Sequence, residues 1–202
     1  MATIFLLSPA YCGGRRAGIL LREGSTLEIA ARLRSGTLSL GEAFSFMSGL
    51  YFRGKITYAR MFAPAPDATL IITPTRGLQS PDIAATADLL HEFAGVDISL
   101  DDARYLEPLE RDLEALAARI PADARVVLLG SVATGKYVDV LVRWLGGRLH
   151  FPPSFIGRGD MSRGGLLLRQ AASRVELEYA VLESTTNRRG RRPQKLDPLT
   201  RP

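Results

Sequence analysis

The chain has 202 residues, of which 46% are hydrophobic and 23% charged, and its formal net charge is +5. This composition suits one globular domain with a sizeable core, and it excludes a fibrous or wholly disordered chain. The single Cys12 excludes an intramolecular disulfide. No run approaches the ~18 apolar residues that a membrane span needs, and the first residues do not have the pattern of a signal peptide. We therefore expect a cytoplasmic monomer without membrane contacts.

The apolar pattern predicts strands and helices in alternation. Short apolar runs predict strands at 4–7, 69–73, 126–129 and 148–151, and alternation predicts an edge strand within 176–182. Helical spacing predicts a helix from a cap at Ser25 or Thr26 to Leu33, a helix over 40–62 in which Gly49 and Gly54 allow a bend or a break, and a helix over 102–120 capped by Asp101. This order predicts a three-layer α/β fold, with a mostly parallel central sheet and helices on both of its faces.

Positive charge is concentrated at the end of the chain. From residue 184 onward, one acid, Asp197, stands against six basic residues: Arg188, Arg189, Arg191, Arg192, Lys195 and Arg201. Residues 1–183 therefore hold twenty positive and twenty negative charges. We expect residues 1–183 to form a single α/β domain and residues 184–202 to form a flexible basic arm. Such an arm suits contact with phosphates, or it serves solubility alone.

Ligands of open α/β sheets bind beyond the carboxyl ends of the strands. Four polar loops follow the predicted strands, at 8–17, 74–82, 130–136 and 152–163. The first loop offers Ser8, a Tyr11 that can stack on a base, and the phosphate-binding side chains Arg15 and Arg16. Cys12 is either a nucleophile or a small buried hydrophobic residue.

Basic and aromatic residues interleave within 51–60, where Arg53 and Lys55 suit phosphate contacts beside stacked bases. The alternative is a core of aromatic side chains with the charges on a solvated face. In the second loop, Arg76 and Gln79 are candidate substrate contacts, and Asp82 is a candidate catalytic acid or base, although turn chemistry also explains the loop's composition.

The third loop fits a phosphate-binding P-loop up to its last position, where Tyr137 replaces the metal-binding Ser or Thr. We therefore expect Ser131 and Lys136 to contact a phosphate or sugar, or the loop to be an ordinary strand-to-helix turn, and we do not expect a nucleotide hydrolase. No His/Cys cluster or carboxylate triad has metal-binding spacing, so we expect neither a metal nor a cofactor.

The fourth loop is the richest in reactive side chains. His150 lies at the end of a predicted strand and is a candidate catalytic residue. Asp160 is a second candidate, although its place before an apolar helix also suits a helix cap. The other candidates in this loop bind substrate: Ser154, Arg158, Ser162 and Arg163.

Several short motifs resemble, in the same order, those of the YaaA-like peroxide-stress family. They are Leu7-Ser8-Pro9-Ala10, Gly49-Leu50-Tyr51, Thr75-Arg76-Gly77-Leu78 with Pro81-Asp82, and the run from Arg158 to Arg163. The resemblance implies DNA binding and protection from oxidative damage. The family's Ser-Pro-Ala-Lys is Ser-Pro-Ala-Tyr11 here, so Arg15 or Arg16 would have to take the place of that lysine.

Residues 126–131 and 150–159 are more distantly similar to the uracil-DNA glycosylase fold. This resemblance implies that His150 stabilises charge on a departing base and that Ser154 holds a flanking phosphate. The glycosylase water-activating motif is absent, so the catalytic base would be Asp82, Asp160 or Glu42. Of the two aspartates Asp82 is preferred, because helix capping alone explains Asp160.

These observations predict an enzyme that acts on DNA, with RNA as the other possible partner. We expect a DNA glycosylase, a hydrolase that excises or processes a damaged or modified base in DNA repair or in antiviral defence against modified phage DNA. The alternative is a non-catalytic DNA-binding protein of the stress response, of YaaA-like type.

Overall fold

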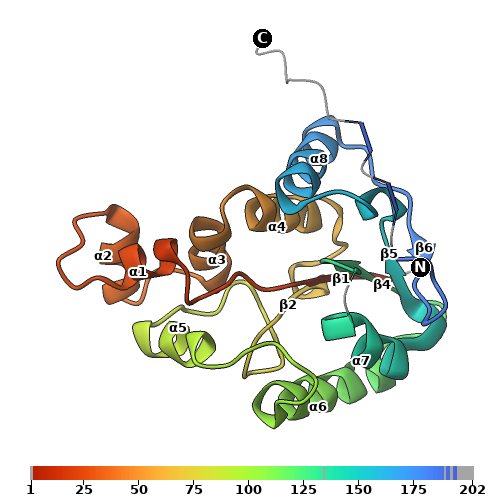
Figure 1. Ribbon diagram of the computed structural model, residues 1–202, viewed down its shortest axis with the longest axis horizontal. Coiled ribbons are helices and arrows are strands. Elements are labelled where there is room, and N and C mark those ends of the chain that lie inside the picture. Colours follow the sequence, from red (N-terminus) through yellow and green to blue (C-terminus); the bar gives the residue numbers. More distant parts are fainter. Residues whose placement is uncertain (1, 134, 189, 192, 195–202) are drawn as a thin grey trace.

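The computed structural model describes residues 2–133, 135–188, 190–191 and 193–194 (Figure 1). Six strands are described: β1 (Thr3–Leu7), β2 (Thr69–Ile72), β3 (Leu78–Gln79), β4 (Arg125–Leu129), β5 (Leu149–Phe151) and β6 (Ala180–Val181). The α-helices are α1 (Arg15–Leu21), α2 (Glu28–Arg34), α3 (Leu40–Ser48), α4 (Leu50–Phe62), α5 (Ala87–Ala94), α6 (Ala103–Arg119), α7 (Gly135–Leu145) and α8 (Asp160–Ser173). The predicted α/β class is confirmed.

The strands form one mixed sheet in the order β3-β2-β1-β4-β5-β6. The four inner strands run parallel, while β3 and β6 pair antiparallel with β2 and β5 at the two edges. The predicted edge strand at 176–182 shortens to the two residues of β6. The hairpin from β2 to β3 was not predicted, and it reverses the chain at a point where the sequence indicates a long loop.

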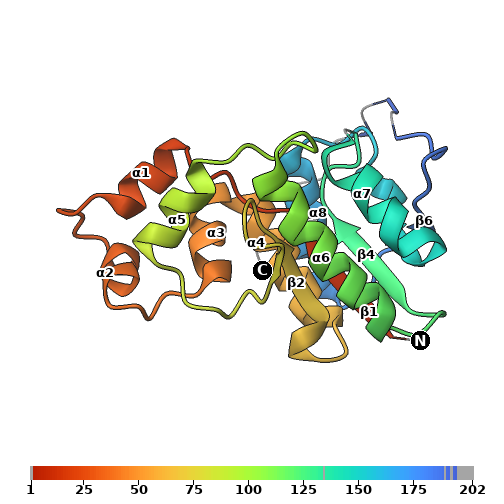
Figure 2. The same ribbon diagram turned by 90° about the horizontal axis from the view of Figure 1, so that it is seen from below.

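Alternate residues of the central strands enter two separate hydrophobic cores. Phe5 and Leu7 pack into the first core, with residues of α1 to α5 and α8. Ile4 and Leu6 pack into the second, with residues of α6 and α7. Helices therefore cover both faces of the sheet, and α1, α2, α3 and α5 extend beyond the carboxyl end of β1 (Figure 1, Figure 2).

Helix ends differ from the sequence predictions in two places. Leu27, and neither Ser25 nor Thr26, precedes α2, and no side chain caps that helix. The amide of Arg104 is capped by Asp102 instead of Asp101. The helical segment over 40–62 breaks at Gly49, one of the two positions that the sequence indicates, because Gly49, at φ +64°, ends α3 and begins α4. That φ lies in the region that glycine adopts most readily.

Helices α4 and α8 cross at two glycines, and this crossing brings the side chains of the site together. A Cβ atom at Gly164 would lie 2.6 Å from the carbonyl oxygen of Leu50, and one at Gly54 would lie 2.7 Å from the carbonyl oxygen of Gly164. Such distances are below van der Waals contact, so only glycines allow these backbones to approach so closely. The side chains of α4 that precede and follow Gly54 consequently lie next to the first turn of α8.

The described part of the predicted basic arm contacts the domain. Arg188 forms an ion pair with Asp139 at 3.4 Å. The backbone at Arg191 passes so close to Gly157 that a Cβ there would collide with the Arg191 carbonyl oxygen. Arg189, Arg192, Lys195 and Arg201 lie outside the described residues. Within the described ranges, no helix combines the length and the apolar character that crossing a membrane requires.

Candidate functional site

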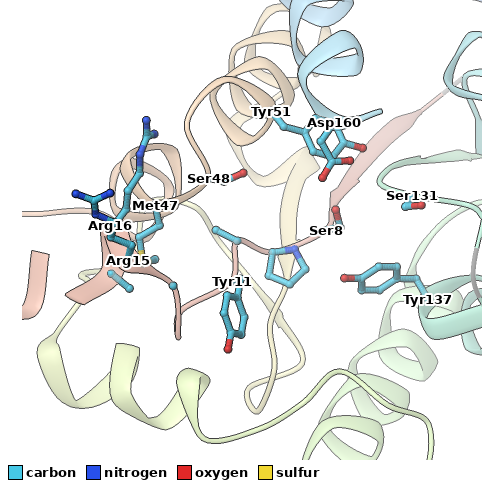
Figure 3. A pocket seen from close by; sticks show the side chains of 14 residues that line it. Ser8, Tyr11, Arg15, Arg16, Met47, Ser48, Tyr51, Ser131, Tyr137 and Asp160 are labelled. Atoms are coloured by element: carbon cyan, nitrogen blue, oxygen red, sulfur yellow. The ribbon is translucent and has the colours of Figure 1, made fainter. Parts of the chain in front are cut away.

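A pocket of about 430 Å³ opens beyond the carboxyl ends of β1 and β4 (Figure 3). Its volume falls within the range of small-molecule sites. The residues that line it come from the β1–α1 loop and α1 (Ser8, Pro9, Ala10, Tyr11, Gly14, Arg15, Arg16, Ala17), from the end of α3 and the start of α4 (Met47, Ser48, Tyr51), and from Ser131, Tyr137 and Asp160. Three of the four predicted loops therefore contribute to it.

The two ends of the pocket differ in chemistry. Ser8, Ser131, Tyr137 and Asp160 gather at one end, and Arg15 and Arg16 lie at the other (Figure 3). Both arginines are exposed, and Arg16 donates a hydrogen bond to the carbonyl of Phe46 at 3.2 Å. The pocket thus has a polar, partly aromatic end and a cationic end.

Tyr11 projects its side chain into solvent, with 73% of its surface exposed. It packs over the adjacent glycines, since a Cβ at Gly13 would meet its ring. An exposed aromatic ring beside two arginines is available to a ligand that is both aromatic and anionic.

Asp160 and Arg163 occupy the first turn of α8. The Asp160 carboxylate, 68% exposed, accepts a hydrogen bond at 3.3 Å from the guanidinium of Arg163, which is buried and also donates to the carbonyl of Phe155. Gly159 is the N-cap of α8 and Asp160 is the first residue of the helix, so the alternative interpretation of Asp160 as the helix cap is wrong. Its carboxylate instead lines the pocket.

Tyr51, which is buried, and Tyr137, which is half-buried, form an aromatic part of the lining. Burial raises the pKa of Tyr137 to about 12, and the negative charge of Asp160 acts in the same direction. Burial likewise raises the pKa of Tyr51. The Tyr51 hydroxyl has no partner at hydrogen-bond geometry among the described residues, although Arg163 lies near it. A buried hydroxyl without a partner calls for an explanation, and a bound ligand would supply one.

Lys55 lies one helical turn after Tyr51 and is 1% exposed. Its Nζ donates to the Ser8 carbonyl and lies 2.9 Å from Ser8 Oγ, and it stands 4.4 Å from the centre of the Tyr51 ring. The sequence predicts a phosphate-binding Lys55, but its burial places it behind the pocket wall, where a phosphate does not reach it.

The second predicted loop does not reach the pocket. The β2–β3 hairpin turns the chain back, so Asp82 lies near Thr69 at the amino end of β2 and pairs with Arg60. Arg76 forms an ion pair with Glu92 at 2.6 Å, and Gln79 donates to the carbonyl of Arg76. These three predicted site residues are therefore apart from Asp160.

His150 is also absent from the lining of the pocket. It pairs with Val127, two residues before the end of β4, and its Nδ1 lies 2.9 Å from the carbonyl oxygen of Arg148. The predicted strand 148–151 is present, but the sequence does not show its register. Because His150 is paired with Val127, it lies before the carboxyl end of β4, where the pocket opens. Glu42, the remaining candidate base, pairs with Arg32 and caps α3, and the Arg32 hydrogen bond lowers its pKa to about 2.

The remaining predicted contacts lie elsewhere on the surface. Arg158 donates to the Ser154 carbonyl and to Ser162 Oγ, so its side chain connects these two residues beside the start of α8. Arg53 and Lys136 are exposed and do not line the pocket. Of the predicted site residues, the pocket brings together Ser8, Tyr11, Arg15, Arg16, Ser131 and Asp160.

Sequence reasoning missed Met47, Ser48, Tyr51 and Tyr137 as parts of the site. Tyr51 and Lys55 are four residues apart on one helix, a spacing that places them on the same face and that the sequence does reveal. Cys12 is buried, and burial raises the pKa of its thiol to about 12, which fits the hydrophobic alternative and not the nucleophile.

Comparisons with known proteins do not assign the chain to a family. No family model, no curated protein and no solved structure matches the chain.

Proposed function

We propose that the pocket receives a base extruded from nucleic acid and that the protein hydrolyses the N-glycosidic bond of a damaged or modified base. The observation that carries the proposal is the combination within one pocket of aromatic rings, two exposed arginines and the carboxylate of Asp160. Enzymes that do chemistry on a base must take it out of the stack into such a pocket, where rings and polar groups hold it.

The cationic end fits the anionic part of this ligand. Arg15 and Arg16 suit phosphate groups beside the extruded nucleotide, because a guanidinium presents paired donors to phosphate oxygens. Tyr11, exposed next to them, suits stacking on a flanking base.

Asp160 is the carboxylate that we assign to the chemistry. Departure of a base leaves positive charge on the sugar, and a carboxylate within reach stabilises that charge electrostatically. Arg163 holds Asp160 from behind without closing it off from the pocket, since most of the carboxylate surface stays exposed.

The alternative is a non-catalytic protein that binds DNA with the same surface. The two functions differ in their products, because only the enzyme leaves abasic sites in DNA. Both functions require DNA to bind at the pocket.

Tyr11→Ala tests the placement of nucleic acid at the pocket. Loss of one stacked base costs about 1–3 kcal/mol, so the affinity for duplex DNA with a destabilised base pair should fall by roughly 5- to 150-fold. A 2-aminopurine at that pair should brighten when wild-type protein extrudes it, and less so with the variant. Met61→Ala, an exposed apolar residue outside the pocket, is the control. Equal affinity and equal brightness for wild type and Tyr11→Ala would count against the pocket as the site.

A chain that ends at Asn187 tests the basic arm. It lacks all six basic residues beyond that point and keeps Leu182, which is fully buried. Its DNA affinity should be lower, and the slope of log affinity against log salt should be shallower by up to about 0.9 for each phosphate that the arm neutralises in the full chain. Unchanged affinity and slope, measured with a folded domain, would make the arm a solubility device.

A further inference from the structure

A serine hydroxyl and a buried amine adjoin at the base of the pocket. Ser8 lines the pocket, although it is only 5% exposed, and Lys55 lies behind it with Nζ 2.9 Å from Ser8 Oγ. A nucleophile and its base are recognised by this kind of contact, with a third group that orients the base. Here the Ser8 carbonyl accepts a hydrogen bond from Nζ and holds the amine in place.

The surroundings of Lys55 are unfavourable for a charged amine. No carboxylate forms a hydrogen bond with Nζ among the described residues, and the centres of the Tyr51 and Phe52 rings lie 4.4 and 4.9 Å from Nζ. A lysine that served only to stabilise the fold would be expected to pair with an acid, because burial of an uncompensated charge is costly.

We propose that Ser8 and Lys55 form a serine–lysine pair, in which uncharged Lys55 takes the hydroxyl proton of Ser8. Ser8 Oγ can then accept a proton from a water in the pocket or attack an electrophile bound there. Serine–lysine pairs are a known variant of the catalytic triad. Gly130 leaves room for the pair, since a Cβ there would lie 3.2 Å from Ser8 Oγ.

The uncharged form of Lys55, which the pair needs, is populated near neutral pH. Burial lowers the pKa of Lys55 from 10.5 to about 7. The two charged groups that act on it belong to α8: Asp160 favours the protonated amine, and Arg163 opposes it. When Nζ is charged it donates to both Ser8 oxygens; when it is neutral, Oγ–H can donate to its lone pair at the same separation.

In the reaction of the pocket, the pair would activate the attacking water, and this role rests on the proposed function. Water attacks the sugar carbon and gives its proton to Ser8 Oγ, while the Ser8 proton passes to Lys55 Nζ. The N-glycosidic bond breaks, its electron pair leaves with the base, and the base takes up a proton from solvent. The pair thus supplies the base that the missing water-activating motif would have provided, while Asp160 stabilises the sugar.

A fluorophosphonate tests the pair without any nucleic acid. Ser8 Oγ attacks phosphorus, fluoride leaves, and the serine proton passes to Lys55. Mass spectrometry should find the adduct on Ser8, with a rate that rises with pH and levels off above about pH 7. Lys55→Met should slow labelling by about 10²- to 10³-fold and remove that inflection. Lys55→Arg keeps the charge but cannot release its proton, so it should not restore the rate.

Ser45→Ala is the control, because Ser45 Oγ donates to the Gly41 carbonyl within α3, and this variant should label as wild type does. Circular dichroism checks that each variant is folded, and Ser8→Ala provides a second, minimal change that should abolish the adduct. Absence of a Ser8 adduct at any pH, or equal labelling of folded Lys55→Met, would overturn the pair. Lys55-dependent labelling without base release from any DNA would leave the pair standing and remove the proposed function. Base release that is unchanged in Ser8→Ala and Lys55→Met would leave the proposed function standing and would remove the pair from its mechanism.

Discussion

Lys55→Met should strongly reduce the pH dependence of the free energy of unfolding. The pKa of Lys55 is about 7 in the folded protein and 10.5 in its ordinary, solvated state. Between these values the unfolded chain binds the proton and the folded chain does not, so wild-type stability rises with pH across this window. The penalty for burying the charge is fully present below pH 7 and is progressively relieved up to about pH 10.5.

Met has a similar length and no charge, so its contribution does not vary with pH. From pH 6 to pH 9 the free energy of unfolding of wild type should therefore increase relative to Lys55→Met by about 2–3 kcal/mol, since one pKa unit corresponds to about 1.4 kcal/mol. Urea denaturation at the two pH values measures the difference. A constant difference between wild type and variant across this range would show that Lys55 keeps its proton in the folded state, against its role as an uncharged base.

Asp160→Asn should have the largest effect on base release. Asn keeps the shape and a hydrogen-bond acceptor for Arg163 but removes the negative charge, so it loses the stabilisation of the cationic sugar. We expect release to slow by about 10²- to 10³-fold, the usual consequence of removing one preorganised electrostatic group, with little change in DNA affinity.

Asp82→Asn is the matched control, because it makes the same chemical change at a carboxylate that pairs with Arg60 outside the pocket. It should release bases at the wild-type rate. Equal rates for Asp160→Asn and wild type, or an equal loss in both variants, would contradict the assignment of Asp160. Sequence reasoning preferred Asp82, because helix capping alone explains an aspartate at position 160. The hairpin between β2 and β3 carries Asp82 away from the pocket and is the reason to prefer Asp160.

Local apolar patterns predicted the inner strands because those strands are buried on both faces, where most side chains must be apolar. The runs at 4–7 and 126–129 coincide with β1 and β4 to within one residue. The same logic predicted where the polar loops follow the strands, and Ser8, Ser131 and Asp160 do meet in one pocket.

Tertiary geometry decided the parts that the sequence did not predict. The two-residue β3 is too short to show alternation, yet it redirects Asp82 away from the pocket. The register of β5 against β4 places His150 opposite Val127, before the carboxyl end of β4, and no local sequence pattern indicates this register. The contact between Lys55 and Ser8 joins α4 to the loop after β1, two segments that are 47 residues apart in the chain, and no local pattern in the sequence indicates it.

The most direct test of the proposed function is to incubate the wild-type protein with duplexes that carry a panel of damaged and modified bases and to measure abasic sites by strand cleavage in alkali. We expect abasic sites on at least one modified base, with release that depends on Asp160. DNA that is bound and carries an extruded base, but yields no abasic site on any member of the panel, would contradict the enzyme and favour the non-catalytic DNA-binding protein.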